Sequence, residues 1–180
     1  MNHQEILEYW FSDSLKAYWF NSTQDIDNEI SKKFLPVWVA ARRHDLDDWL
    51  QTADGTLAMI IVLDQLPLNM FRDQADSFLT EKQSIDIAKE AIKKGYDKLI
   101  DKQRRMFMYL PFMHSEDIQN QNESVRLFKK SGLKENLKFA EHHRSIVERF
   151  GRFPHRNAIL GRQSTEAEIA YLNSDEAFKG

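Results

Sequence analysis

The chain has 180 residues, enough for one domain, and 42% of them are hydrophobic, so it can bury a sizeable core without disulfides. It contains no cysteine, which excludes thiolate zinc sites and cysteine nucleophiles. A net charge of −3 argues against a protein that binds nucleic acid through its overall charge. No apolar run can cross a membrane and the start of the sequence has no signal-peptide pattern, so we expect a cytoplasmic protein.

The first half of the chain has three stretches that predict helices. Apolar residues recur at helical spacing over residues 25–43, where Pro36 predicts a kink or a fresh helix start. Residues 56–66 are apolar on most sides, which predicts a central helix that ends at Pro67. The pattern at residues 80–83 predicts a capping box that opens a third helix.

Glycines and capping residues predict the helix boundaries in the second half. Gly95, Gly132 and Gly151 each follow a helical pattern and are expected at helix C-termini. One helix should end at Leu110, because Pro111 follows it. The expected starts of the later helices are Asp101, Ser115, Leu133, Pro154 and Thr165, the last with a second capping box.

These patterns predict an all-α protein with seven to nine helices joined by short turns. Short connections favour antiparallel neighbours, so we expect a single domain over residues 1–180, built as an antiparallel helical stack. The sequence has no glycine-rich phosphate loop and no dinucleotide fingerprint, so no cofactor is expected.

A first group of polar residues follows the central apolar helix, and consists of Asp64, Gln65, Asn69 and Arg72. A buried carboxylate is costly unless it is paired and hydrogen-bonded, so Asp64 needs a partner if it is buried. Two interpretations stay open. Asp64 either braces the turn at Pro67 or contributes, with its polar neighbours, to a ligand site.

A second group contains His114, Glu116 and Asp117. A histidine beside carboxylates is typical of acid–base chemistry, because the pKa of histidine lies near neutrality. The spacing fits no metal motif, so no metal site is expected. The alternative is an N-terminal helix cap whose acids favour the helix dipole. His143 also lies between Ala140 and Val147, where core residues are expected, as part of a polar network or a pocket floor.

A third group lies in the stretch Gly151 to Thr165, and its candidate ligand-binding residues are Arg152, His155, Arg156 and Asn157. If a helix begins at Pro154, its N-terminal N–H groups and these cations would form an anion site. The same arginines could instead pair inside the fold with Glu116, Asp117 or Asp64. The sequence alone does not separate these interpretations.

The chain resembles the bacterial domain-of-unknown-function family 924 in four sequence motifs. These are ILEYWF near the start, LDQLPLNMFR, YLPFMHSED and HHRSIVERFGRFPHRNAILGR. The resemblance covers nearly the whole chain. It implies an all-helical fold similar to tetratricopeptide-type superhelices in cytoplasmic proteins, and it implies no activity. One departure is Leu68, which stands where the family pattern has an arginine.

Three functional hypotheses follow. The first is a binding module whose polar groove holds a small anionic ligand or an acidic peptide. The second is a structural scaffold in which the arginine, histidine and acid motifs are internal clasps. The third is an enzyme, a hydrolase or a proton-transfer enzyme, that uses His114 or His155 with Glu116 or Asp117. The sequence predicts neither the identity of a ligand nor an oligomeric state.

Overall fold

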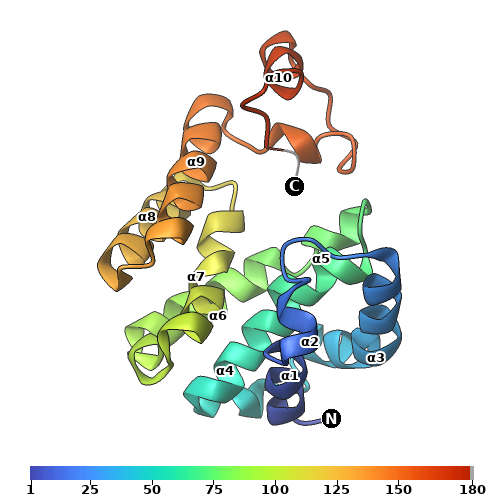
Figure 1. Ribbon diagram of the computed structural model, residues 1–180, viewed down its shortest axis with the longest axis vertical. Coiled ribbons are helices and arrows are strands. Elements are labelled where there is room, and N and C mark those ends of the chain that lie inside the picture. The colour runs from blue at the N-terminus through green and yellow to red at the C-terminus, as the bar shows by residue number, and fades with distance from the viewer. Residues whose placement is uncertain (179–180) are drawn as a thin grey trace. The chain divides into compact units, whose positions relative to one another are not determined.

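The computed structural model describes residues 1–178, and every regular element within them is helical (Figure 1). The α-helices of the first half are α1 (His3–Trp10), α2 (Asp13–Lys16), α3 (Gln24–Arg42), α4 (Ala53–Ile60) and α5 (Leu66–Met70). Those of the second half are α6 (Glu81–Lys93), α7 (Lys102–His114), α8 (Ile118–Ser131), α9 (Lys134–Phe150) and α10 (Glu166–Leu172). The predicted all-α class is confirmed.

Five short segments of 3₁₀- or π-helix complete the list of helical elements in the described residues. Four of them are 3₁₀-helices and one, η2, is a π-helix: η1 (Asp47–Gln51), η2 (Ile61–Gln65), η3 (Ala75–Phe78), η4 (Tyr96–Leu99) and η5 (Pro154–Arg156). Among the α-helices, α2 and α5 span only four and five residues. The eight longer α-helices over residues 1–178 agree with the predicted number.

The chain divides into two compact units. Unit 1 consists of Met1–Arg72 and Asp76–Pro111, and unit 2 of Asp73–Ala75 and Phe112–Gly180. The main boundary falls inside α7, which explains why the sequence has no linker-like stretch at this point. Each unit is described below by itself.

Unit 1 is built around α4 and its continuation η2. Residues 57–63 are each no more than 1% exposed, because this stretch is apolar on all sides of the helix. Helices α1 and α6 pack against α4, and α3 packs against η2 and α5. Trp10, Phe34 and Phe107 add the largest fully buried side chains of the unit. The prediction of a central helix is confirmed.

The central helix does not end at Pro67 as the sequence predicts. The chain passes through the π-helix η2 and continues as α5, with Pro67 in the first turn of α5. A proline is tolerated there because the N–H group it lacks would have no partner within the helix. Single π-helical turns occur often at functional sites, and this one carries Asp64 and Gln65.

Several predicted boundaries are confirmed. Gly132 and Gly151 end α8 and α9 in the left-handed conformation, with φ of 67° and 71°. Gly95 follows α6 with φ of 76°. At Thr165 the predicted capping box is present, since the Thr165 side chain and Glu168 each accept a hydrogen bond from the other's backbone N–H.

The capping box predicted at residues 80–83 is wrong. Helix α6 does begin at Glu81, but the Thr80 side chain caps nothing. Thr80 Oγ1 donates to the Leu63 carbonyl at 2.6 Å and accepts from Trp38 Nε1 at 3.1 Å. A buried tertiary hydrogen bond therefore takes the hydroxyl that the local pattern assigned to the cap.

Proline positions account for three further differences. Helix α7 continues through Pro111 to His114, although its end was predicted at Leu110, and α3 continues through Pro36, so no fresh helix starts there and the alternative, a kink, stays a prediction. The proline that should open a helix at residue 154 opens only the three-residue η5. A proline in a helix interior removes one backbone hydrogen bond, and the apolar residues on both sides of it still favour the helix.

Unit 2 contains α8 and α9, which lie side by side as an antiparallel pair (Figure 1). One of its buried apolar clusters consists of Ile146, Val147, Phe153 and Tyr171, and Phe178 packs against this cluster. Phe153 is fully buried although it lies among the basic residues of the stretch Gly151 to Thr165. The residues around Phe153 are therefore held against a core and not in a free loop.

Gly55 allows a test of packing in unit 1. A Cβ atom at this position would overlap the Trp49 carbonyl oxygen, which is backbone and cannot move aside. Replacing a helical glycine with alanine normally stabilises a helix by roughly 0.5–1 kcal/mol. We expect the opposite here, a loss of about 2 kcal/mol for Gly55→Ala, because the overlap strains the core.

Urea unfolding followed by tryptophan fluorescence measures this effect, since Trp49 itself belongs to unit 1. The exposed neighbour Asp54→Ala, in the same helical turn, should change stability by no more than about 0.5 kcal/mol. A Gly55→Ala protein as stable as the parent would contradict the expected overlap.

Candidate functional site

Two of the polar residues predicted in unit 1 meet at Asp27, a carboxylate that sequence reasoning missed. Asp27 is 4% exposed and lies in α3. Arg72 Nε donates to Asp27 Oδ2 at 2.6 Å, and Asn69 Nδ2 donates to Asp27 Oδ1 at 2.8 Å. Desolvation favours a higher pKa for Asp27, but the hydrogen bonds from Arg72, Asn69 and Ser22 outweigh it and lower the pKa. Asn69 and Arg72 thus tie α5 and the turn after it to α3.

Asp64 and Gln65 are both buried in η2, with exposures of 5% and 4%. Gln65 Nε2 donates to Asp64 Oδ2 at 2.5 Å, and Ser84 Oγ of α6 lies 3.5 Å from Asp64 Oδ1. These contacts hold Asp64 against Gln65 and α6, and the interpretation that Asp64 braces the turn at Pro67 stays a prediction. Leu68 is half-buried in α5, and the guanidinium that binds Asp27 comes from Arg72.

In unit 2 the predicted anion position holds a carboxylate of the protein itself. Glu116 Oε1 accepts the Phe153 backbone N–H at 2.8 Å, directly before η5. Arg162 Nη1 and Nη2 donate to Glu116 Oε2 and Oε1 at 2.6 and 2.8 Å. Burial alone would raise the pKa of Glu116, but Arg162 and the Phe153 N–H lower it. We call this pair the Glu116–Arg162 clasp.

A second clasp joins Arg152 to Glu168. Arg152 Nε and Nη2 donate to Glu168 Oε1 and Oε2 at 2.7 and 2.9 Å, and Nη2 also donates to the Gln163 carbonyl at 2.9 Å. Glu168 is 2% exposed, and the hydrogen bonds from Arg152 lower its pKa to about 2. Since Glu168 is also the capping-box acid of α10, this clasp fixes the start of that helix.

Asn157 and Asp117 have structural hydrogen bonds as well. Asn157 is 1% exposed, and its side chain accepts from Arg162 Nε and donates to Ser164 Oγ, both at 3.0 Å. Asp117, and not Ser115, is the N-cap of α8, because Asp117 Oδ1 accepts from the Gln119 N–H at 2.7 Å. Arg162 and the Phe153 N–H thus hold Glu116, and Asp117 caps α8, while the enzyme hypothesis stays a prediction.

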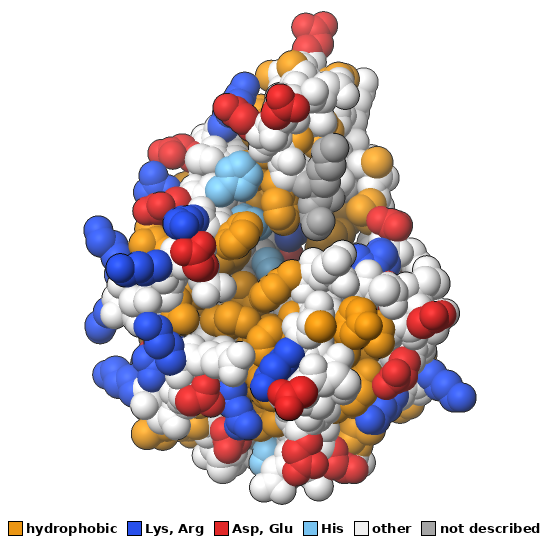
Figure 2. All heavy atoms as spheres, in the orientation of Figure 1, with side chains coloured by type: hydrophobic (Ala, Val, Ile, Leu, Met, Phe, Trp, Pro, Cys, Tyr) orange, Lys and Arg blue, Asp and Glu red, His pale blue; other side chains and the backbone are white. Residues whose placement is uncertain are grey.

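Three basic residues of unit 2, His143, His155 and Arg156, lie against the Phe153 ring, and together with His114, which Arg156 contacts, we call them the histidine cluster. Arg156 Nη2 donates to the His114 carbonyl at 2.8 Å, and its guanidinium lies 4.7 Å from the Phe153 ring. The His143 and His155 rings lie 5.5 and 5.6 Å from the same ring. Figure 2 shows histidine side chains close together beside hydrophobic ones, where α9 lies in Figure 1.

Burial keeps two of these histidines neutral at pH 7. Desolvation lowers the pKa of His143 to about 3, despite a hydrogen bond to the Phe139 carbonyl, and neighbouring His114, His142 and Arg156 lower it further. Desolvation and Arg156 lower the pKa of His155 to about 4. Within the cluster, His143 and His155 therefore resist taking up protons beside the cationic Arg156.

The Nδ1 atoms of His143 and His155 differ in their hydrogen bonding. His143 Nδ1 lies 2.8 Å from the Phe139 carbonyl, so Nδ1 carries the proton and Nε2 is an acceptor in the neutral ring. His155 Nδ1 is inaccessible to solvent and has no hydrogen-bond partner within residues 1–178. A buried polar atom of this kind marks a position where a ligand or an ordered water can bind.

Sequence reasoning found most of the cluster and named Glu116 as a possible partner of an arginine, but it did not single out Arg162, Glu168 or Asp27. His143 was already marked by its polar character between apolar neighbours on α9. Arg162, Glu168 and Asp27 had no comparable signal, because their partners lie 46, 16 and 45 residues away in sequence. The predicted groove that combines Asp64 with Arg156 stays a prediction, since these residues belong to different units.

The described residues contain no group of three or more histidine, cysteine, aspartate or glutamate side chains that could hold a metal ion. None of the helices over residues 1–178 is long and apolar enough to cross a membrane.

Residues 6–176 match the family model described as bacterial protein of unknown function, DUF924. A solved structure of a protein of unknown function from Agrobacterium tumefaciens is 40% identical, with a TM-score of 0.90 over 95% of this chain and 96% of that chain. The comparison with curated proteins finds no match. The family match spans nearly all of the sequence, so the chain belongs to the bacterial family of unknown function DUF924.

Proposed function

We propose that unit 2 is a binding module whose histidine cluster holds a small oxyanion, a carboxylate or a phosphate. The observation that carries the proposal is His155 Nδ1, an inaccessible nitrogen without a hydrogen-bond partner in the described chain, in a cluster with an arginine and two more histidines. An anionic oxygen accepts a hydrogen bond from this nitrogen and is attracted by the guanidinium of Arg156.

In this proposal the two clasps have a structural role, and the histidine cluster contacts the ligand. Arg152 and Arg162 hold Glu168 and Glu116, so they act as the frame and leave ligand contact to the cluster. A frame built of two-pronged ion pairs fixes the positions of Phe153 and η5, from which His155 and Arg156 extend. Preorganisation of this kind lowers the entropic cost of holding a small ligand.

A thermal-shift experiment with inorganic phosphate and with succinate tests the proposal. An anion at about 10 times its Kd should raise the unfolding midpoint by roughly 3 °C. The shift should be larger at pH 6 than at pH 8, because a bound anion favours the protonated form of a histidine. In His155→Phe, which keeps the ring contacts and loses the nitrogen, the shift should fall to less than half.

The matched control is His44→Gln, which replaces an exposed histidine of unit 1. This variant should show the same anion-dependent shift as the parent. Arg156→Ala is a poorer probe, because it also strands the His114 carbonyl and opens a gap over Phe153. An anion shift that is absent, or that survives unchanged in His155→Phe, would leave the scaffold hypothesis as the better account.

The scaffold hypothesis is the second candidate, and the ion-paired arginines favour it. Arg72, Arg152 and Arg162 each bind a carboxylate through their guanidinium groups. Buried ion pairs can specify one packing arrangement without any ligand. Under this hypothesis variants of the clasps lose stability, and no anion stabilises the parent protein.

A further inference from the structure

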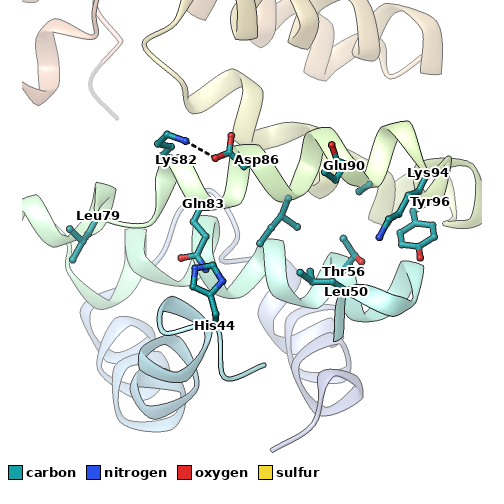
Figure 3. A pocket seen from close by; sticks show the side chains of 12 residues that line it. His44, Leu50, Thr56, Leu79, Lys82, Gln83, Asp86, Glu90, Lys94 and Tyr96 are labelled. Atoms are coloured by element: carbon teal, nitrogen blue, oxygen red, sulfur yellow. Dashed lines mark hydrogen bonds and ion pairs between the residues drawn. The ribbon is translucent and has the colours of Figure 1, made fainter. Parts of the chain in front are cut away.

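A groove in unit 1 runs along α6, separate from the residues used in the proposed function. It lies between α6 on one side and η1, α4 and η4 on the other (Figure 3). Its volume is about 580 Å³, which falls within the ~300–1,000 Å³ of known ligand pockets. Leu50, Leu79, Ile87 and Ala91 supply apolar lining, so the groove can bury hydrophobic side chains.

Charged residues of α6 form the rim of this groove. Lys82, Asp86, Glu90 and Lys94 follow one another at four-residue spacing, which places them along one side of the helix. Lys82 Nζ pairs with Asp86 at 2.6 Å, as Figure 3 shows, and Glu90 pairs with Lys93 at 3.4 Å. Lys94 has no ion-pair partner within residues 1–178 and stands 5.4 Å from the Tyr96 ring. The uncompensated charge of the rim is therefore positive and lies at the Tyr96 end.

The dimensions of the groove indicate the shape of what it holds. Lys82 and Lys94 are twelve residues apart, which corresponds to about 18 Å along a helix. The apolar lining residues and Tyr96 are distributed along this length. An extended chain advances ~3.3 Å per residue, so about five extended residues span the groove.

We propose that this groove binds an extended, five-residue segment of a partner protein with the pattern apolar–any–apolar–any–acidic. Alternate side chains of an extended segment point to the same side, so its first, third and fifth side chains enter the groove. The two apolar side chains contact Leu79, Ile87 and Leu50. The carboxylate pairs with Lys94 beside Tyr96, where the rim charge is positive.

The test uses two fluorescein-labelled peptides, Gly-Leu-Ser-Leu-Ser-Asp-Gly and its reverse, Gly-Asp-Ser-Leu-Ser-Leu-Gly, because the groove admits either chain direction. Binding is measured by fluorescence polarisation. We expect one of the two to bind, and Lys94→Glu to weaken it about tenfold, since an attraction becomes a repulsion. A peptide with lysine in place of aspartate should prefer the Lys94→Glu variant over the parent.

The matched control is Lys89→Glu, the same charge change at another exposed position of α6, which neither lines the groove nor pairs with a residue of its rim. It should weaken binding less than twofold. Far-UV circular dichroism checks that both exposed variants keep the parent's helical content. Failure of both peptides to bind at millimolar concentration, or an equal effect of Lys89→Glu and Lys94→Glu, would overturn the proposal.

Discussion

Glu116→Ala should lower the free energy of unfolding of unit 2 by about 3 kcal/mol, since it removes one partner of a mostly buried ion pair. The side chains of Glu116 and Arg162 are only 25% and 23% exposed. The substitution removes the carboxylate that pairs with the Arg162 guanidinium. It also removes the hydrogen-bond acceptor of the Phe153 N–H. Buried donors without partners carry most of the cost, because they have lost water and gain nothing in return.

The Glu123–Arg126 pair of α8 provides the control. Arg126 Nε and Nη2 contact Glu123 at 2.7 and 2.5 Å, the same two-pronged arrangement, but these side chains are 53% and 32% exposed. Glu123→Ala should therefore cost less than about 0.5 kcal/mol. Equal losses in Glu116→Ala and Glu123→Ala would show that burial does not decide the strength of the clasp.

The double variant Glu116→Leu with Arg162→Met separates the cost of a stranded charge from the value of the pair. Replacing both partners with apolar side chains leaves no buried charge, so part of the lost stability should return. A double variant less stable than Glu116→Ala would mean that the pair itself contributes most of the stabilisation.

The probe for these measurements has to report on unit 2. The four tryptophans, at positions 10, 19, 38 and 49, all belong to unit 1, so tryptophan fluorescence follows unit 1. Urea unfolding is therefore recorded by far-UV circular dichroism, to which α8 and α9 contribute. A change confined to the circular dichroism signal locates the effect in unit 2.

The sequence predicted the features that depend on local chemistry. Gly132 and Gly151 end helices because the left-handed conformation suits a residue without a side chain, and the spacing of Thr165 and Glu168 alone makes a capping box. Thr80 failed as a cap because its best partner, the Leu63 carbonyl, is brought near only by the folded chain. Local patterns cannot weigh such tertiary partners.

The candidate site was predicted only in part for the same reason. The polar residues of the Gly151–Thr165 stretch were correctly singled out, but a helix N-terminus was expected where the structure has three-residue η5. Internal pairing of arginines with acids was one of the open interpretations, and Arg162 realises it with Glu116. The pairing of Arg152 with Glu168 requires α10 to fold back onto η5, which residue spacing does not encode.

Acid should destabilise unit 2 at a pH well above the range where its carboxylates titrate. The pKa values of His143 and His155 in the folded state are about 3 and about 4, against ~6.5 in the unfolded chain. Between these values the unfolded state binds more protons, so stability is complete above pH 6.5 and declines as the pH falls. We expect a loss of about 4 kcal/mol between pH 6.5 and pH 4.5, to which each histidine contributes about 2 kcal/mol.

Substitutions at the two positions isolate this effect. His143→Phe and His155→Phe keep aromatic rings against Phe153 and remove a titrating group, so each should flatten the decline by roughly half. Carboxylates with lowered pKa values, Asp27, Glu116 and Glu168, lose their contribution only below about pH 4.3, so the window above it reports on the histidines. Far-UV circular dichroism in urea at several pH values gives the slope.

An anion bound at the cluster should reduce this acid sensitivity, which links the stability measurement to the proposed function. A bound oxyanion beside His155 offsets the desolvation that keeps the imidazole neutral, so the folded protein takes up a proton more easily. With phosphate present, the decline between pH 6.5 and pH 4.5 should be shallower in the parent and unchanged in His155→Phe. Equal slopes with and without phosphate in the parent would mean that the cluster's low histidine pKa values are a property of packing alone.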